Sequence, residues 1–489
     1  MSLPKKLSRR RFVSSLAATS AMISTVASTR PTVARSVSMS NDEIRLGFIS
    51  CGGRANEHLS TFTKFKGAAV TALCDPDSIK VERARSQFAP QAKGYSDLRK
   101  LIDDPNVDAV VIATCNHWHC LAAIWAMQAG KDVYVEKPLS HSQWEGQQTI
   151  AAARKYNRIC QVGTQQRSDP MQKEIKAFLH EEKGIGEILS ARVNRYGVRK
   201  SIGLRSTPLP IDPKIDYDLW LGPAQDRPIF RENFHYDWHW DFNTGSGEMG
   251  NWGVHVLDDL RNNVFLDKVN LPKRIFGGGG RVVWNDAGET PNVHFVYFDT
   301  GTIPVVIGLS NLTEGTGSDK QPKVKGPGSG YIAYGQGGRL EGQRGGAVAF
   351  DAKGKEIKRF RGNSGNGLHQ ENFLNAVRTR DASILAADVQ VGHDSTGWCN
   401  LANVVYQTGE AFSMEAAEQV KLPEWRSLLG EMKDHLAAHS LEMEDANLRI
   451  SKMLEFDPIK EVFVGDGSQD ANKYLKREYR APYVVPEIT

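Results

Sequence analysis

Between residues 44 and 162, short β-type runs alternate with amphipathic helical stretches. This alternation is typical of a parallel sheet, because parallel strands need a crossover helix to return the chain to the same edge. It predicts a doubly wound α/β domain of the Rossmann type, with its ligand at the carboxyl ends of the strands. The expected strands are 44–50, 68–74, 109–113, 132–135 and 158–162, and the expected helices are 56–65, 78–88, 95–102, 119–129 and 141–156.

The pattern changes after residue 165, where longer strand-like runs follow one another with few helices between them. This predicts a second α/β domain on an open, mostly antiparallel sheet, which would bind substrate and support a homo-oligomer, a dimer or tetramer. We expect strands at 188–196, 274–283, 293–299 and 302–309, a long loop at 314–346, and helices at 370–379, 395–412 and 428–448. The expected segments are a leader at 1–40, a Rossmann domain at 41–165, a substrate domain at 166–415 and a tail at 416–489.

The leader contains Arg9, Arg10 and Arg11, followed by an apolar run rich in Ala and Ser. It resembles a twin-arginine signal peptide, which implies export by the twin-arginine machinery to the periplasm or another extracytoplasmic space. A disordered basic tail or a mitochondrial-type leader is the alternative. No later apolar run reaches the roughly 18 residues needed to cross a bilayer, so we expect no membrane span.

The net charge of +4 also originates in this leader, since residues 1–35 carry seven of the 61 basic residues and none of the 57 acidic ones. The remainder is slightly acidic, which argues against a nucleic-acid partner. The six cysteines have neither metal-binding spacing nor a paired framework. We therefore expect no disulfide and no bound metal.

The first expected strand runs into a glycine turn directly before a helix, as a dinucleotide pyrophosphate requires. Against the pattern G-x-G-x-x-G, Gly52 is the middle glycine, while Ser50 and Ala55 replace the outer two. Asp75 ends the second strand twenty residues after Ala55, where a carboxylate binds both ribose hydroxyls and repels a 2′-phosphate, so NAD is favoured over NADP. An ordinary tight loop and a turn-forming Asp before Pro76 are the alternatives. The predicted cofactor residues of this region are Ser50, Gly52, Gly53, Arg54 and Asp75.

Two further strand ends carry polar motifs, with Glu136-Lys137-Pro138 after one strand and the segment 114–119 after the strand before it. With these motifs, the chain from about 44 to 412 resembles the glucose-fructose oxidoreductase and inositol dehydrogenase family, Gfo/Idh/MocA. The resemblance implies a Rossmann domain, an α/β substrate domain, NAD or NADP, and carbohydrate-like substrates. It also implies that Lys137 contacts the substrate and the nicotinamide ribose, although a surface lysine before a proline is the alternative. The further cofactor contacts expected here are Thr114, Asn116, His119, Glu136, Lys137 and Gln165.

The segment 247–258 matches the family pattern D-x-G-x-H-x-x-D, with Asn251 where Asp is common. His255 matches the catalytic histidine and lies four residues after Asn251, so both would face the same way on a helix. Histidine can take the hydroxyl proton as hydride leaves carbon, and the Lys137 ammonium can stabilise the oxygen. Asn251 cannot accept a proton as Asp can, so we expect it to orient the substrate. A buried structural histidine is the alternative for His255.

The segment 233–241 is dense in aromatic and imidazole side chains, which can stack on a sugar ring and bind its hydroxyls. Plain aromatic packing beneath the glycine loop 245–247 is equally consistent with it. The expected substrate contacts are Arg167, Tyr236, Trp238, His239, Asn251 and His255.

These features favour an NAD-dependent oxidoreductase that moves a hydride on or off a hydroxyl-bearing carbon of a sugar or glycoside. Two alternatives remain. One is a glycosidase that oxidises the ring transiently, eliminates the aglycone and returns the hydride. The other is a non-catalytic sugar-binding relative.

Overall fold

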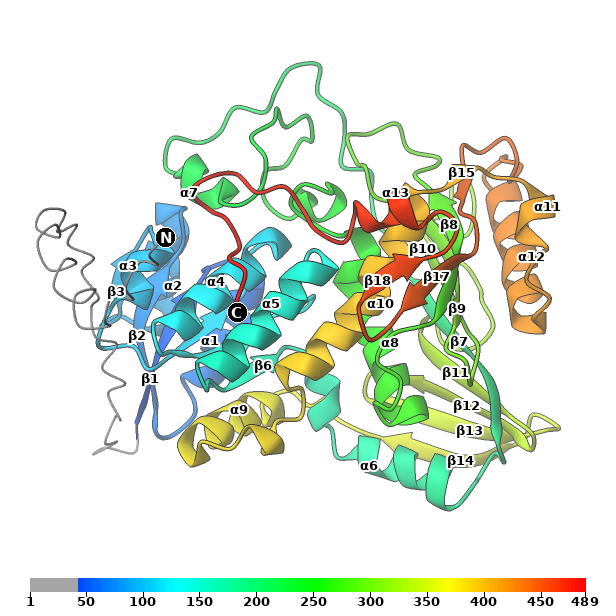
Figure 1. Ribbon diagram of the computed structural model, residues 1–489, viewed down its shortest axis with the longest axis horizontal. Coiled ribbons are helices and arrows are strands. Elements are labelled where there is room, and N and C mark those ends of the chain that lie inside the picture. Colours follow the sequence, from blue (N-terminus) through cyan, green and yellow to red (C-terminus); the bar gives the residue numbers. More distant parts are fainter. Residues whose placement is uncertain (1–42) are drawn as a thin grey trace, which may run out of the picture. The chain divides into compact units, whose positions relative to one another are not determined.

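The computed structural model describes residues 43–489, whose strands form two β-sheets (Figure 1). The predicted signal peptide lies outside the described residues. Because the contacts join 43–489 into one unit, the boundaries at 165 and 415 remain predictions. No helix among the described residues has both the length and the apolar character of a membrane span.

The first sheet is the predicted parallel Rossmann sheet, with six strands in the order β3-β2-β1-β4-β5-β6. All five predicted strands are present, but β3 was missed because it is only three residues long and lies at the sheet edge. The helix expected at 95–102 begins only at Leu98, because the Asp97 side chain accepts a hydrogen bond from the Arg99 N–H and caps it. The strands are β1 (Ile44–Ile49), β2 (Ala68–Cys74), β3 (Lys93–Tyr95), β4 (Ala109–Ile112), β5 (Asp132–Val135) and β6 (Cys160–Val162). The helices are α1 (Gly53–Phe62), α2 (Ser78–Phe88), α3 (Leu98–Ile102), α4 (His119–Gln128) and α5 (Gln143–Lys155).

The second sheet has twelve strands and is antiparallel except where β7 and β10 pair in parallel. The predicted loop at 314–346 is wrong, because β11 and β12 occupy its second half. β11 pairs with β7 on one side and with β12 on the other, so distant partners stabilise a glycine-rich run with little strand character of its own. The first strands are β7 (Ile188–Tyr196), β8 (Arg274–Gly280), β9 (Val293–Asp299), β10 (Val305–Ser310), β11 (Ser329–Gly335) and β12 (Gly338–Gln343). The others are β13 (Gly346–Asp351), β14 (Glu356–Arg361), β15 (Glu410–Ala411), β16 (Arg449–Ile450), β17 (Leu454–Asp457) and β18 (Val462–Val464).

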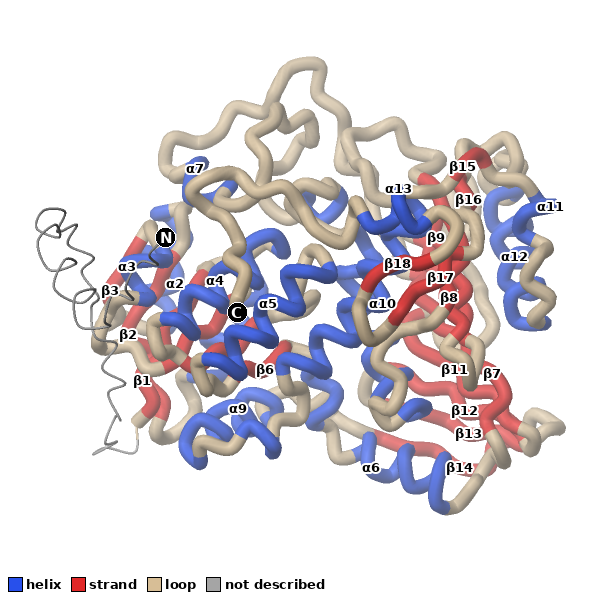
Figure 2. Tube along the Cα trace, viewed as in Figure 1, coloured by secondary structure: helices blue, strands red, loops and turns tan. Residues whose placement is uncertain are grey.

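Helices of the second half link its sheet to the Rossmann half, and a long irregular stretch lies between β7 and α8 (Figure 2). The helix expected at 395–412 begins earlier, at Val389, because the Asp388 side chain caps it by accepting a hydrogen bond from the Gln390 N–H. The helix expected at 428–448 runs instead from Pro423 to Ala437. The helices are α6 (Met171–Lys176), α7 (Tyr217–Leu221), α8 (Val254–Leu260), α9 (Leu368–Thr379), α10 (Val389–Gln407), α11 (Met414–Ala417), α12 (Pro423–Ala437) and α13 (Ser468–Asn472).

The segment after residue 415 packs against both halves of the molecule. Strands β16 and β17 pair with β8, so this segment extends the second sheet. The chain then returns to the Rossmann half, where Tyr483 and Val485 lie in the apolar core (Figure 1). The Ile488 N–H also donates to Gln148 Oε1 of α5, at 2.7 Å. The expected tail is therefore an integral part of the fold.

Candidate active site

A cavity of about 660 Å³ lies at the carboxyl ends of the Rossmann strands and extends to α8. Its walls come from separate segments of the chain, and they contain every predicted cofactor and substrate residue except Arg167. The predicted residues that line it are Ser50, Gly52, Gly53, Arg54, Asp75, Thr114, Asn116, His119, Glu136, Lys137, Gln165, Tyr236, Trp238, His239, Asn251 and His255.

The turn before α1 has the features that a pyrophosphate site needs. Ser50, at the position of the first glycine of the motif, has φ 87°, in the region that favours glycine. This backbone conformation is the reason why glycine is usual at this position. Holding a serine in it adds strain that destabilises the folded protein by about 1–3 kcal/mol. A Cβ added at Gly53 would meet open space, and the first turn of α1 has neither an acidic residue nor a side-chain cap. The amino end of α1 is therefore open to an anion, so these residues fit a dinucleotide.

Asp75 is buried at the end of β2 and anchors this turn. Its Oδ2 accepts a hydrogen bond from the Cys51 N–H at 2.8 Å, and its Oδ1 accepts one from the Asp77 N–H at 2.9 Å. Burial raises the pKa of Asp75, while the charge of Lys80 and the two N–H groups oppose that shift. Each oxygen keeps a second lone pair for a ribose hydroxyl.

Replacing Asp75 with asparagine is expected to shift cofactor preference toward NADP. The charge that repels a 2′-phosphate would be lost while the size of the side chain is kept, so the preference for NAD should fall by about tenfold or more. Calorimetric titration with NAD and with NADP measures this ratio. Asp108→Asn is the matched control, because Asp108 pairs with Arg45 and does not line the cavity. An unchanged ratio in Asp75→Asn would refute the assigned role.

The Glu136 carboxylate is the shared hydrogen-bond acceptor for a group of side chains behind the cavity wall. Its Oε1 accepts hydrogen bonds from Arg54 Nε at 2.9 Å and from Gln165 Nε2 at 2.9 Å, and it lies 2.8 Å from His58 Nε2. Although burial opposes ionisation, Arg54 and His58 hold the pKa of Glu136 well below its usual range. Glu136 therefore fixes Arg54 and Gln165 at the cavity edge, and its own contact with a cofactor stays a prediction.

The segment 114–119 is held by contacts to neighbouring loops. Asn116 Nδ2 donates to Ser246 Oγ at 2.8 Å. The two ring nitrogens of His119 lie 2.7 Å from the Pro138 carbonyl oxygen and 3.2 Å from that of Thr114. These bonds tie the ends of β4 and β5 together beside Lys137.

Lys137 reaches across the cavity from the end of β5 to the turn that precedes α8. Its Nζ donates to the Asn251 carbonyl oxygen at 2.8 Å and lies 3.4 Å from Asn251 Oδ1. Burial lowers the pKa of Lys137 to about 8, opposed by Glu136 and reinforced by Arg54. The Asn251 side chain is itself oriented, because its Nδ2 donates to Glu248 Oε2 at 3.2 Å. The lysine therefore gains or loses its proton close to neutral pH.

His255 lies on α8, one turn beyond Asn251, and that first turn is a wider π-type turn rather than the expected α-helical one. The imidazole packs edge-on to Trp252, with 5.6 Å between ring centroids, and no hydrogen bond joins it to another residue of 43–489. Burial holds the pKa of His255 well below its usual range, and the charges of Lys137 and Arg344 lower it further. The ring is therefore neutral and able to accept a proton.

The aromatic segment 233–241 both packs together and lines the cavity. The rings of Trp238 and His239 are stacked, with centroids 3.7 Å apart, and Arg199 Nη1 donates to Tyr236 Oη at 3.0 Å. The segment therefore forms aromatic packing contacts and also lines the cavity. Contact of these side chains with a sugar remains a prediction.

Arg167 is the predicted site residue that the structure corrects. Its Nε donates to both carboxylate oxygens of Asp258 at 2.8 Å, and its other nitrogens bind Asp267 at 2.7 and 2.9 Å. The guanidinium is thus held in a buried ion-pair network and does not line the cavity. The sequence could not reveal this, since both carboxylates come from a segment about 90 residues further along the chain.

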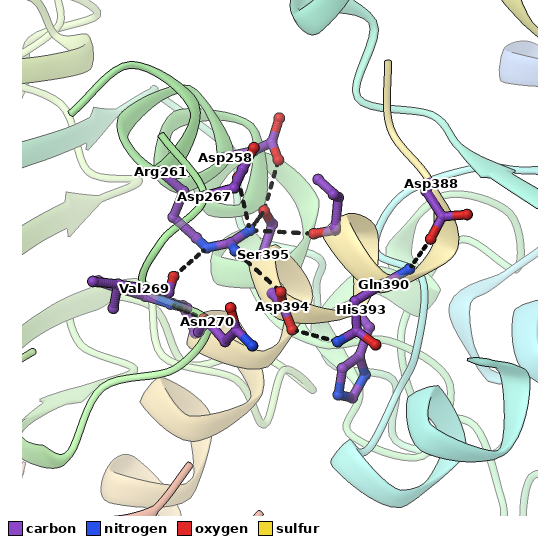
Figure 3. Close-up of polar contacts among 12 residues, drawn as sticks. Asp258, Arg261, Asp267, Val269, Asn270, Asp388, Gln390, His393, Asp394 and Ser395 are labelled. Atoms are coloured by element: carbon purple, nitrogen blue, oxygen red, sulfur yellow. Dashed lines mark hydrogen bonds and ion pairs between the residues drawn. The ribbon is translucent and has the colours of Figure 1, made fainter. Parts of the chain in front are cut away.

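The same network locks α8 to α10 (Figure 3). Arg261 is fully buried; its Nη1 donates to Ser395 Oγ at 2.6 Å and its Nη2 donates to Asp394 Oδ2 at 3.2 Å. Arg261 Nε donates to the Val269 carbonyl oxygen at 3.2 Å, and Ser395 Oγ donates to Asp258 Oδ1 at 2.6 Å. The helix that carries His255 is therefore held rigidly behind the cavity.

Trp252 and Arg344 are among the cavity residues that the sequence reasoning missed. Trp252 lies inside the motif segment 247–258, so its position could have been inferred from the motif. Arg344 lies within the segment expected to be a loop, and no local signal indicates that it reaches the cavity. No group of residues in 43–489 has the composition of a metal site, and the six cysteines are free.

Two family models match this chain in the regions just described. Residues 44–164 match the NAD-binding Rossmann domain of the Gfo/Idh/MocA oxidoreductase family, and residues 199–306 match its C-terminal α/β domain. The chain is therefore similar to the Gfo/Idh/MocA family over both of these regions. The first of these regions is accordingly an NAD-binding domain.

Individual Gfo/Idh/MocA relatives match over shorter stretches. Inositol 2-dehydrogenase of Salmonella paratyphi B is 30% identical over 155 residues, which is 31% of this chain and 46% of that protein. A glycosyl hydrolase family 109 protein of a Shewanella species is 33% identical over 129 residues, 25% of this chain and 28% of that protein. The chain thus spans less than half the length of these relatives.

Solved structures show the same fold. The WlbA dehydrogenase of Bordetella pertussis, in complex with NADH and UDP-GlcNAcA, superposes with a TM-score of 0.54 at 19% identity. The match covers 73% of this chain and 94% of that one. At this identity the likeness shows the shared fold alone.

Proposed function

We propose that this chain is an exported, NAD-dependent oxidoreductase that transfers a hydride between the nicotinamide and a hydroxyl-bearing carbon of a sugar or glycoside. The observation that carries the proposal is the meeting of Lys137, Asn251 and His255 in one cavity with the Gly52 turn and Asp75. These side chains supply a neutral base, an ammonium and a dinucleotide site within one cavity.

The Rossmann side of the cavity would hold the dinucleotide. The free N–H groups at the start of α1 would bind the pyrophosphate, and Asp75 would bind the ribose hydroxyls. Gln165 and Lys137 line the same cavity as His255, and the nicotinamide would lie among them. When bound, the nicotinamide accepts or returns the hydride.

The protein's own part in the reaction is proton transfer and charge stabilisation. The neutral His255 imidazole would accept the proton of the reacting hydroxyl. The Lys137 ammonium, held in position by the Asn251 carbonyl, would stabilise negative charge on the substrate oxygen. Asn251 thereby acts as an orienting residue.

A redox-assisted glycosidase is the second candidate, and the similarity to glycosyl hydrolase family 109 proteins favours keeping it. The same residues would serve both reactions, since each begins with removal of hydrogen from a ring carbon. Net products separate them: a dehydrogenase accumulates NADH, whereas the glycosidase releases free sugar with no net NADH.

We also propose that residues 1–40 direct the folded protein through the twin-arginine machinery to the periplasm or another extracytoplasmic space. The three consecutive arginines and the apolar run after them support this proposal.

Native mass spectrometry combined with a sugar panel tests the proposed activity. The purified protein is expected to bind one dinucleotide per chain, to show its assembly size as a dimer or tetramer, and to generate NADH absorbance or release sugar from glycosides. A protein that is folded but binds no dinucleotide, and that leaves every sugar, polyol and glycoside unchanged, would refute the proposal.

A further inference from the structure

The turn between β12 and β13 brings Arg344 to the catalytic cavity, and buried contacts fix this turn. Gln166 Nε2 donates to the Gln343 carbonyl oxygen at 3.1 Å, and Gln166 Oε1 accepts from the Gly345 N–H at 3.3 Å. Gly345 has φ 72°, and its carbonyl oxygen accepts from the Gly362 N–H at 3.0 Å. Gln166 directly follows the cavity residue Gln165, so the turn is tied to the site itself.

The Arg344 guanidinium lies against the Trp252 ring, 5.8 Å from its centroid, and lines the cavity together with Lys137 and His255. A second cation–π neighbour of Trp252 is Arg195, at 4.5 Å from the ring centroid. Within residues 43–489, no ion pair or hydrogen bond joins the Arg344 side chain to a partner. The N–H donors of its planar guanidinium are therefore available to a ligand in the cavity.

The carboxylates around this end of the cavity are already engaged by other cations. Glu136 binds Arg54, and Glu248 binds Arg195 and Arg199. Both acids are buried, and the arginines paired with them balance their negative charge.

Asp259 also lies behind the Arg344 turn, where its Oδ2 accepts from Gln166 Nε2 at 3.1 Å. Burial raises the pKa of Asp259 well above its usual range and the neighbouring Asp258 reinforces the shift, while the charges of Arg344 and Arg167 oppose it. The cavity wall beside His255 thus carries two cations, Lys137 and Arg344, and within residues 43–489 neither forms an ion pair with a carboxylate.

We propose that the substrate is an anionic sugar whose carboxylate or phosphate is bound by Arg344; this proposal rests on the proposed function. The planar guanidinium offers two parallel N–H donors to either group, and contact with Trp252 restricts its orientation. The anionic group would fix the ring in the cavity while the reacting hydroxyl faces His255. The missed Arg344 thus becomes the residue that determines specificity.

Three probes of matched shape test this inference: D-glucuronate, D-glucose 6-phosphate and D-glucose. Calorimetric titration into the NAD-loaded protein is expected to show at least one anionic probe binding about tenfold or more tightly than glucose. Arg344→Gln should weaken that binding by about 10- to 100-fold, a much larger loss than any change in the binding of NAD or of glucose. Arg344→Lys should recover only part of it, because a lysine offers no planar fork. Arg339→Gln on the same hairpin is the control, since Arg339 pairs with Glu341 away from the cavity.

The proposal is overturned if neither anionic probe binds better than glucose. It is also overturned if the Arg344→Gln protein prefers the anionic probe over glucose by the same factor as the parent protein. In that case NADH formation from a neutral sugar would leave the proposed function standing. Loss of the proposed function is a separate result, because it requires that the folded parent protein bind no dinucleotide.

Discussion

Replacing Lys137 with methionine is expected to lower kcat by about 10²- to 10⁴-fold, with NAD affinity changed by less than about threefold. Methionine keeps much of the side-chain volume but removes the ammonium that faces the reacting oxygen. The Asn251 carbonyl also loses its donor, so a small reorientation of that turn adds to the loss. Steady-state kinetics and a separate NAD titration measure the two quantities.

The same variant tests the pH dependence of kcat/KM for oxidation. Because the pKa of Lys137 is lowered to about 8, the ammonium is fully present below that pH and is lost as the pH rises through it. The parent kcat/KM for oxidation should therefore fall above pH about 8, and Lys137→Met should lack this limb. Lys64→Met is the matched control, since Lys64 is exposed and outside the cavity. A Met variant with parental rates, or with the same pH limb, would remove Lys137 from the mechanism and favour the non-catalytic binding relative.

Replacing Arg261 with methionine is expected to lower the free energy of unfolding by about 3–5 kcal/mol. Arg261 is fully buried, and its loss leaves the Asp394 carboxylate without its cation (Figure 3). Arg274→Met is the matched control, because Arg274 forms an exposed pair with Asp299 that should contribute less than about 1 kcal/mol. Urea unfolding followed by circular dichroism measures both variants.

A double variant distinguishes loss of charge balance from loss of packing. Adding Asp394→Leu to Arg261→Met removes the unpaired carboxylate, so part of the lost stability should return. Equal destabilisation by the buried and the exposed arginine variants would show that the network does not hold α8 to α10. No recovery in the double variant would assign the loss to packing alone.

The local pattern of the sequence was sufficient for the Rossmann half except for the three-residue edge strand β3. Its buried strands are short apolar runs bounded by glycine and polar residues, and each signal lies within a few residues. The Gly52 turn, Asp75 and Lys137 follow directly from strand ends, because parallel strands deliver their carboxyl ends to one edge. His255 was found through its motif, and its neighbour Asn251 through the spacing between them.

The tertiary structure alone decided which distant groups meet. Strands β11 and β12 form because β7 supplies hydrogen-bond partners about 140 residues away, and the turn that follows β12 brings Arg344 to the cavity. Arg167 was predicted to contact substrate, but two acids from another segment hold it in the core. Local propensity contains no information on such pairings. The sequence by itself thus determined the nucleotide fold and the lysine and histidine that line its cavity, whereas long-range strand pairing and buried charge pairing decided which arginine faces the cavity.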